Sequence, residues 1–281
     1  MPELPEVETV RRTLEPVIVG KRIKHCAIYY ERVLPRADAG EFSQSVSGRL
    51  ITGIKRRGKY LIISLDRTLE LIAHLRMTGQ LIYQPQRDLP LQKHTSARFW
   101  FEGNGELRFT DQRKFGTLYL VEKGKYQDIH GLHTLGPEPL AAEFTWTLLA
   151  EKLNSERAVK AILLDQTKIA GLGNIYADEA LHRAGIHPLK PGSCLHASEV
   201  KALHGSITEV LQEAIACHGT TIRDYRTGSG AAGSFQNKLR VYRQTGKPCA
   251  NCGTWIARIK VGGRSTHFCP KCQRWDPDCT D

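Results

Sequence analysis

The chain has 281 residues, of which 41% are hydrophobic, so it can bury a substantial core and is not intrinsically disordered. Lys and Arg outnumber Asp and Glu by 40 to 29, and the net charge of +11 favours a polyanionic partner such as nucleic acid or an anionic membrane surface. No apolar run reaches the length of a transmembrane helix, no basic amphipathic helix with a broad aromatic face appears, and the N-terminus lacks a secretory pattern. These exclusions leave nucleic acid as the favoured partner.

The first predicted element is a helix that begins near Pro5. Proline suits the first turn of a helix, and Glu6 and Glu8 face its positive end. Apolar residues follow at spacings of three and four, which predicts one buried face: Val7, Val10, Leu14 and Val17. Pro16 is expected to disturb the last turn, and Gly20 is expected to end the helix.

From Lys21 to about Val121 the hydrophobic period changes from helical to two. Five segments read as strands, separated by turn signals: KYLIISL, LELIAHL, ARFWF, ELRFT and GTLYLV. Short strands at this spacing, with no helices between them, favour an antiparallel sandwich or barrel.

The second half of the chain returns to the helical period after a Gly- and Pro-rich linker, HTLGPEPL (133–140). Four segments are predicted to be helices: FTWTLLAEKLN, AVKAILLDQ, NIYADEALHRAG and SEVKALHGSITEVLQEAIACHG. The stretch TGSGAAGSF (227–235) is predicted to be a mobile loop. The chain therefore reads as an α+β protein with a β domain, a helical domain and a small cysteine-rich module.

Four of the eight cysteines form two C-x-x-C pairs separated by sixteen residues: Cys249, Cys252, Cys269 and Cys272. This spacing predicts a tetrahedral Cys₄ zinc site, which is structural because no coordination position stays open. So short a module cannot bury a core of its own, so zinc binding should drive its folding. Two redox pairs or a coincidence remain the alternatives. Cys279 is expected to be a free thiol, and the mixture of paired and scattered thiols fits a reducing cytoplasm.

Several basic residues stand at predicted turns. Lys59 adjoins an apolar strand in IKRRGKYLI, where a solvated turn is the alternative to an amine held in place. HLRMTG puts His74 and Met77 near a strand end, and Met77 is either a core residue or an apolar wedge. In TDQRKFG, Arg113 and Phe115 point the same way if the chain is extended. They could then fill the space left by an extruded base, although a core Phe and a surface Arg remain the plainer interpretation.

Two further segments can bind phosphate. The turn KVGGRST presents Arg264 beside two glycines, as in a hairpin that holds a cation against phosphate. GLGNIYADEALHRAG feeds a Gly-rich turn into a helix through Asn174, where free backbone N–H groups could bind an anion. Asn174 could equally be a plain N-cap.

Together these segments resemble the bacterial formamidopyrimidine-DNA glycosylases, the 8-oxoguanine DNA glycosylases with lyase activity. The motifs span almost the whole chain: PELPEVETVRR, RRGKY, HLRMTG, KH, DQRKFG, GLGNIY, GTTIRDY and the C-terminal cysteines. The resemblance implies a catalytic β-sandwich domain at 1–132, a linker at 133–150, a helix–two-turn–helix DNA-binding domain with a lesion loop at 151–241, and a zinc-finger module and tail at 242–281. It also implies excision of oxidised purines from double-stranded DNA, followed by β,δ-elimination at the abasic site.

The resemblance also assigns roles by motif. It implies that Pro2 is the nucleophile, Glu3 the acid/base, Lys59 the essential lysine and Arg264 the zinc-finger arginine that binds phosphate. Three residues match a trio that fills the space left by a flipped base: Met77, Arg113 and Phe115. Four residues fall where family members contact or support the DNA backbone: His74, His94, Lys160 and Asn174.

Some positions depart from the family pattern. The segment before the zinc module reads VYR, with Arg243 where relatives often have glycine, so backbone freedom is reduced there. NSERAVK carries fewer cations than many relatives, which leaves contacts near Glu156 in doubt, and the tail WDPDCTD has no assigned role. The related endonuclease VIII group, which acts on oxidised pyrimidines, tends to begin PEGPE, so PELPE favours the purine side.

The implied chemistry depends on the first residues. Removal of Met1 would leave Pro2 with a secondary α-amine whose pKa, about 7.7–8.0, makes an appreciable fraction nucleophilic at neutral pH. Attack at the sugar C1′ would displace the base and form an iminium, which then favours elimination. Glu3 could act as the general acid, and the target base must first be flipped out of the duplex.

Two alternatives to an oxidised-purine glycosylase remain at this point. One is an endonuclease VIII-like glycosylase for oxidised pyrimidines, and the other is a non-catalytic zinc-ribbon nucleic-acid-binding protein. Pro2 argues against the second, because a binding module has no use for an imine-forming amine. The sequence shows no sign of an oligomer interface, so a monomer is expected. A location in the cytoplasm, associated with the nucleoid, is expected for an enzyme that acts on DNA.

Overall fold

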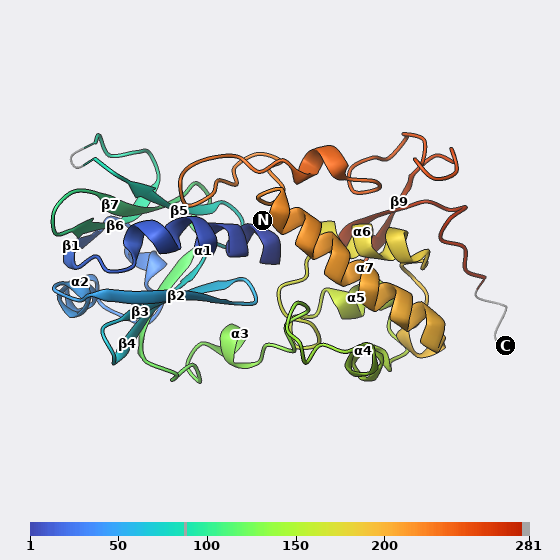
Figure 1. Cartoon of the computed structure of the whole chain (residues 1–281), viewed down its shortest axis with the longest axis horizontal. Helices are drawn as coiled ribbons and strands as arrows, with labels where there is room; N and C mark the ends of the chain where they lie inside the picture. The colour runs from blue at the N-terminus through green and yellow to red at the C-terminus, as the bar shows by residue number, and fades with distance from the viewer. Residues whose placement is uncertain (87–88, 277–281) are drawn as a thin grey trace. The chain divides into compact units, whose positions relative to one another are not determined.

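The computed structural model describes residues 1–86 and 89–276, and its contacts divide the chain into two compact units (Figure 1). The first unit contains Met1–His133 together with Ile215–Gln236. The second contains Thr134–Ala214 together with the described residues from Asn237 onward. Cys279, expected to be a free thiol, lies outside the described residues.

Two antiparallel four-stranded sheets form the first unit, as the sequence predicted (Figure 1). One sheet has the order β2-β3-β4-β8, with strands at Ile51–Arg57, Tyr60–Leu65, Leu69–His74 and Thr117–Glu122. The other has the order β1-β6-β7-β5, with strands at Ile23–Ile28, Thr95–Phe101, Glu106–Asp111 and Gly79–Gln84. All five strand segments read from the sequence are confirmed.

The expectation that no helices interrupt the strands is wrong. A 3₁₀ turn, Glu31–Val33, and helix α2, Ala39–Val46, lie between β1 and β2. The side chain of Asp38 caps α2 by accepting hydrogen bonds from the Gly40 and Glu41 N–H groups. Phe42 and Val46, four residues apart, are both buried, so this short helix has the apolar face that it needs for packing.

Helix α1, Leu4–Ile18, packs against β2 and β5, the edge strands of the two sheets, and so covers one side of the sandwich. Its buried face contains the predicted residues Val7, Val10 and Leu14. Ile18 completes that face, whereas Val17 is only partly buried. Pro16, expected to disturb the last turn, lies inside the helix, which continues to Ile18. Gly20 follows the end of the helix with a φ of +85°.

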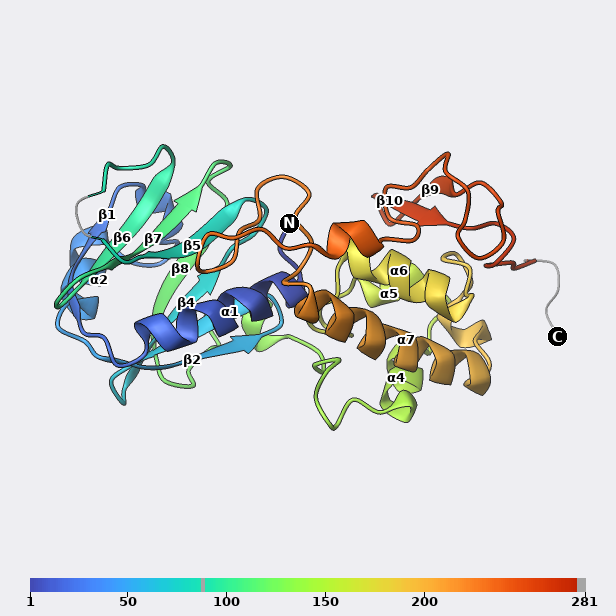
Figure 2. The same cartoon turned by 45° about the horizontal axis from the view of Figure 1, so that its top comes forward.

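The second unit is helical and ends in a β-hairpin. The four predicted helical segments are confirmed as α4, Trp146–Leu153, α5, Val159–Leu163, α6, Asn174–Ala184, and α7, Ala197–Ala216. Short elements complete the chain: α3, His130–His133, and 3₁₀ turns at Gly192–Cys194 and Phe235–Lys238. The hairpin consists of β9, Ala257–Val261, and β10, Arg264–Phe268 (Figure 2). Within the described residues, no helix is long and apolar enough to cross a membrane.

Candidate functional site

The strand register brings three turns to one end of the sandwich. Arg57 pairs with Tyr60, Tyr60 pairs with His74, and His74 pairs with Thr117. The β2–β3, β4–β5 and β7–β8 turns therefore lie at the same end of the sandwich, because each is joined to one of these paired strand ends. These turns carry the sequence candidates Lys59, Met77, Arg113 and Phe115.

The beginning of α1 is fixed by Glu6, whose carboxylate is buried. The Glu3 N–H donates to one Glu6 oxygen at 2.8 Å, and the Thr220 N–H donates to the other at 2.7 Å. Pro2 and Glu3 are also buried. One carboxylate thus holds the first helical turn and a backbone segment 214 residues away in sequence in a fixed relation.

The Gly-rich stretch 227–235, predicted to be mobile, is irregular but held at several points. The Tyr83 N–H of β5 donates to the Gly228 carbonyl at 2.9 Å, and the Gly228 N–H donates to Thr13 Oγ1 at 2.8 Å. A Cβ at Gly228 would collide with Leu14 of α1, so only glycine allows this close approach. The stretch is therefore anchored to α1 and β5.

Lys59 lies in the tight turn between β2 and β3 and is only 7% exposed. Close by, burial together with the charges of Arg76 and Lys59 lowers the pKa of His74 to about 3. His74 is thus neutral at physiological pH. Its Nδ1 accepts the Arg76 N–H at 3.0 Å, so the proton resides on Nε2, which is left as a hydrogen-bond donor. A neutral donor beside a lysine suits a phosphate oxygen.

The three residues proposed to fill a base vacancy are brought together by the structure. Arg113 Nη1 lies 3.0 Å from Met77 Sδ, and its guanidinium stacks 5.0 Å from the centre of the Phe115 ring. Phe115 is 52% exposed and Met77 39%, which excludes the core interpretation of both residues. The chain here is not extended as expected. It turns at residues 112–115, with Lys114 at a φ of +58°, and this turn places Arg113 beside Phe115.

Sequence reasoning missed the residue that holds this cluster together, Asp111. Its buried carboxylate accepts the N–H groups of Phe115 at 2.8 Å and Gly116 at 2.6 Å on one oxygen. Its other oxygen accepts the Arg113 N–H at 3.1 Å and the Thr78 hydroxyl. Thr78 follows Met77 directly, so one carboxylate orders both turns. An acid at the end of a strand, immediately before a turn, was the available signal.

His94 lies beside this arrangement. It precedes β6 with a φ of +66°, and its carbonyl accepts the Asp111 N–H at 2.9 Å. The imidazole is half-buried. His94 is thus placed at the same end of the sandwich as the three turns.

The remaining predicted residues lie in the second unit, around the β9–β10 hairpin. Lys160 is completely buried, and its amine lies 2.6 Å from Asp178 Oδ1 and 2.7 Å from Thr266 Oγ1. It also donates to the Ser265 carbonyl at 3.1 Å, which accepts Asn174 Nδ2 at 2.9 Å as well. Lys160 therefore supports the hairpin backbone from inside.

Asn174 is the first helical residue of α6, and Gly173 occupies the N-cap position, so the plain N-cap interpretation is wrong. Arg264, exposed at the start of β10, directly precedes the doubly bonded Ser265. Lys160 and Asn174 thus hold the backbone from which Arg264 projects.

The four predicted cysteines converge, with all four sulfurs within 4.8 Å of one another. The Cys252–Cys269 and Cys249–Cys272 sulfur distances are 3.4 and 3.9 Å. A zinc tetrahedron with bonds of about 2.3 Å has sulfur–sulfur edges of about 3.8 Å, so the cluster fits one ion and not two separate redox pairs. Its surrounding core is small, with Val241 and Ile256 as the buried aliphatic members. One structural Zn²⁺ accounts for the order of this module.

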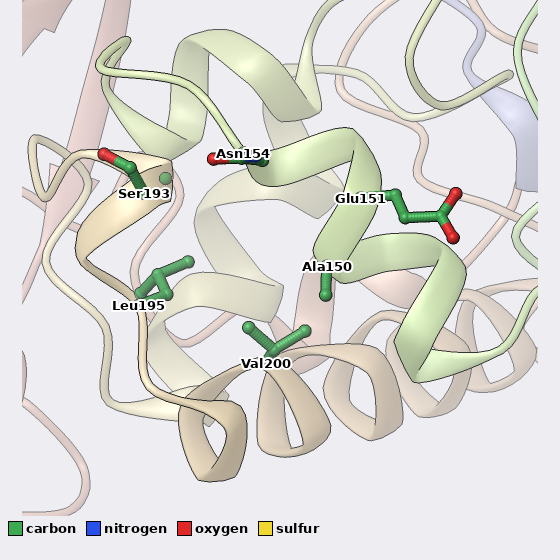
Figure 3. A pocket seen from close by; sticks show the side chains of 7 residues that line it. Ala150, Glu151, Asn154, Ser193, Leu195 and Val200 are labelled. Atoms are coloured by element: carbon green, nitrogen blue, oxygen red, sulfur yellow. The ribbon is translucent and has the colours of Figure 1, made fainter.

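A cavity of about 310 Å³ lies in the second unit (Figure 3). Its lining residues, six of which are labelled in Figure 3, are Ala150, Glu151, Asn154, Gly192, Ser193, Leu195 and Val200. None of the candidate residues lines it, so we assign it no part in the site.

Three family models match consecutive parts of the chain. They are the formamidopyrimidine-DNA glycosylase N-terminal domain at residues 1–118, the formamidopyrimidine-DNA glycosylase H2TH domain at 135–226, and the zinc finger found in FPG and IleRS at 246–274.

Curated relatives and solved structures agree with these matches. A formamidopyrimidine-DNA glycosylase from Geobacillus kaustophilus is 46% identical over 98% of this chain and 100% of its own length. One from Pelotomaculum thermopropionicum is 45% identical over 98% of this chain and 99% of its own. The Lactococcus lactis FPG (MutM) in complex with a FAPY-dG-containing DNA superposes with a TM-score of 0.90 at 43% identity, covering 97% of this chain and 100% of that one. MutM in complex with a carbocyclic 8-oxo-G-containing DNA gives 0.90 at 44% identity, covering 98% and 100%.

Proposed function

The chain belongs to the formamidopyrimidine-DNA glycosylase family, and we propose that Pro2 is the nucleophile with which it excises oxidised purines from duplex DNA and then cleaves the strand. The observation that carries the proposal is the fixed start of α1. Pro2 and Glu3 are buried, and Glu6 ties the Glu3 backbone, directly after Pro2, to Thr220. Most N-termini are loose, whereas a nucleophile must be held in place to react.

The chemistry begins with the secondary amine of Pro2 after removal of Met1. The amine lone pair attacks C1′ of the damaged nucleoside, and the bonding electrons leave with the base. Opening of the sugar ring gives an iminium between Pro2 and C1′. Loss of a C2′ proton then expels the 3′ phosphate by β-elimination, and a second elimination expels the 5′ phosphate. One nucleophile therefore supports both base removal and strand cleavage.

Glu3 is the candidate general acid for this reaction. It adjoins Pro2 in the chain, and its side chain is 2% exposed. A buried carboxyl next to the amine can protonate the sugar ring oxygen while C1′ is attacked, which typically supplies about 10²–10⁴-fold in rate.

The exposed cluster of Met77, Arg113 and Phe115 supports the base-flipping step. An extruded base leaves a gap in the stack, and an apolar side chain paired with a stacked guanidinium can fill it. His74 and Lys59 are proposed to bind phosphate oxygens at the same end of the sandwich, with His94 beside them. In the second unit, Arg264 is proposed to bind phosphate, with Asn174 and the buried Lys160 supporting its backbone.

We also propose the functional division implied by the motifs: a catalytic domain at 1–132, a linker at 133–150, a DNA-binding domain at 151–241 and a zinc module from 242. A cytoplasmic, nucleoid-associated location suits a DNA substrate. It also suits Cys26, Cys194 and Cys217, which are free thiols in the structure.

The test is covalent trapping. Incubation of the zinc-loaded, Met1-processed protein with 8-oxoguanine duplex and borohydride should reduce the iminium to a stable protein–DNA adduct, and Pro2→Gly should reduce the yield sharply. A thymine glycol duplex, added as competitor, should compete weakly. Absence of an adduct with the processed wild-type protein would refute the role of Pro2.

A further inference from the structure

Glu8, in the second turn of α1, is surrounded by guanidinium groups. Its Oε1 accepts from Arg11 at 2.9 Å and from Arg12 at 2.8 Å, and its Oε2 accepts from Arg56 Nε at 3.1 Å. The Glu8 side chain is 11% exposed and that of Arg56 is 10% exposed. Burial alone would raise the pKa of Glu8, but the hydrogen bonds from Arg11 and Arg12 and the charge of Arg56 hold it below its usual value.

Arg56 connects this carboxylate to the turn that carries Lys59. Its Nε binds Glu8, and its Nη1 donates to the Gly58 carbonyl at 3.0 Å. Gly58 has a φ of +55°, and Lys59 follows it directly. In Figures 1 and 2 the C-terminal end of β2 lies beside the N-terminal part of α1, which agrees with these bonds. Glu8 and Lys59 are thus linked through one rigid, planar side chain.

The carboxylate is important for this link because Arg56 is nearly buried. A buried guanidinium that loses its anion is strongly penalised and seeks solvent or another partner. If Arg56 moved, the Gly58 carbonyl would lose its donor, and the backbone immediately before Lys59 would be less constrained. The same helix carries Pro2 and Glu3 at its start, so the link also sets Lys59 relative to them.

We infer that Glu8 is a positioning residue for the glycosylase reaction, and that it acts through Arg56 to place Lys59 relative to the first turn of α1. The inference rests on the proposed function, in which Lys59 binds a phosphate oxygen of the DNA substrate.

The experiment compares Glu8→Gln with Glu15→Gln. Both substitutions remove one negative charge from α1, and both remove a partner of Arg11, whose Nη1 binds Glu15 at 2.7 Å. Glu15 is half exposed, and in the described part of the chain the carboxylate that pairs with Arg56 is that of Glu8. Single-turnover borohydride trapping on 8-oxoguanine duplex should slow at least tenfold in Glu8→Gln and change less than twofold in Glu15→Gln. Affinity for a duplex containing a tetrahydrofuran abasic analogue should fall in Glu8→Gln, because Lys59 is proposed to bind a phosphate oxygen, and should change less than twofold in Glu15→Gln. Trapping is therefore measured with the protein at saturating concentration.

Two further variants separate positioning from general destabilisation. Arg56→Lys keeps the charge but loses the fork that bridges Glu8 and Gly58, so it should slow trapping as Glu8→Gln does. Trapping by the Lys59→Ala variant, which is followed over hours, is compared with trapping by the Lys59→Ala, Glu8→Gln double variant. The added Glu8→Gln should slow trapping by less than twofold, because its effect passes through Lys59.

The outcomes are distinguishable. Equal losses in Glu8→Gln and Glu15→Gln, or a Glu8→Gln loss that persists in full in the Lys59→Ala background, would overturn the inference while leaving the proposed function intact. If the wild-type protein forms no adduct, the proposed function fails first and the inference fails with it.

Discussion

Replacing Asp111 by Asn should uncouple base extrusion from strand cleavage. The Asp111 carboxylate accepts four hydrogen bonds, and two of the donors are the N–H groups of Phe115 and Gly116. Asn keeps the shape of the side chain but offers one acceptor oxygen and an NH₂ group. The NH₂ group must then face two donors, on one side of the carboxyl position or the other. The substitution therefore loses two of the four hydrogen bonds by which Asp111 orders the two turns.

The magnitude follows from the two lost bonds. Hydrogen bonds to a charged group contribute about 1.5–3 kcal/mol each, so two give about 3–6 kcal/mol as an upper range. Phe115 is 52% exposed, so its turn can relax and recover part of this loss. A net cost near 3 kcal/mol in the flipped complex corresponds to about a hundredfold in rate, at about 1.4 kcal/mol per tenfold.

The assay compares two substrates under single-turnover conditions. Excision of 8-oxoguanine requires extrusion of a base, and it should fall about a hundredfold in Asp111→Asn. Cleavage at a preformed abasic site has no base to extrude, and it should fall less than threefold. Asp66→Asn is the matched control, since Asp66 accepts the Leu50 N–H at 3.0 Å in the β3–β4 turn at the opposite end of the strands. Equal losses on both substrates would refute the argument that Asp111 acts by ordering the cluster of Met77, Arg113 and Phe115.

Three other predictions concern stability. Because the folded pKa of His74, about 3, lies below its unfolded value of about 6.5, the folded state resists protonation and stability falls as pH drops below 6.5. Between pH 7 and pH 5 His74 should cost about 2 kcal/mol, so His74→Gln should flatten the pH dependence of urea unfolding over that interval. Lys160→Met strands Asp178 without its buried ammonium partner and should destabilise the second unit by about 3–5 kcal/mol, measured by thermal unfolding against exposed Lys125→Met. Chelation of zinc should abolish the order of the β9–β10 hairpin, seen by NMR, and weaken DNA binding while the β-sandwich stays folded.

The sequence predicted those features whose signal is local. The Cys₄ cluster follows from two C-x-x-C pairs, and α6 and α7 follow from helical periodicity, because each pattern lies within a short window. Helix α2 was missed because its signal is brief: one Asp cap and two apolar residues within eight positions. The turn at Lys114 was missed because a positive φ at lysine has no simple sequence signature.

The supporting contacts of the site could not be read from the sequence for a different reason. Glu6 and Thr220 are 214 residues apart, and Glu8 and Arg56 are 48 apart. Each pair exists only because the sheets and α1 fold as they do. Lys160 illustrates the same point, since a lysine in a short amphipathic segment reads as exposed. The Lys160 ammonium group can be buried because Asp178 pairs with it and the Ser265 carbonyl of the hairpin accepts its hydrogen bond.

The positive charge of the chain is distributed in a way that favours DNA binding more than its composition suggests. Among the described residues, eight acidic side chains are buried: Glu3, Glu6, Glu8, Glu70, Glu106, Asp111, Asp178 and Glu179. Only half as many basic ones are buried: Lys59, Arg98, Arg108 and Lys160. Most of these acids hold backbone N–H groups or guanidiniums inside the fold, as Glu6 and Asp111 do. Structural tasks therefore remove carboxylates from the surface, and the exposed charge is more cationic than the formal +11. Burial of these acidic side chains therefore has two effects: it orders the site, and it leaves the surface more positive toward the phosphate backbone of DNA.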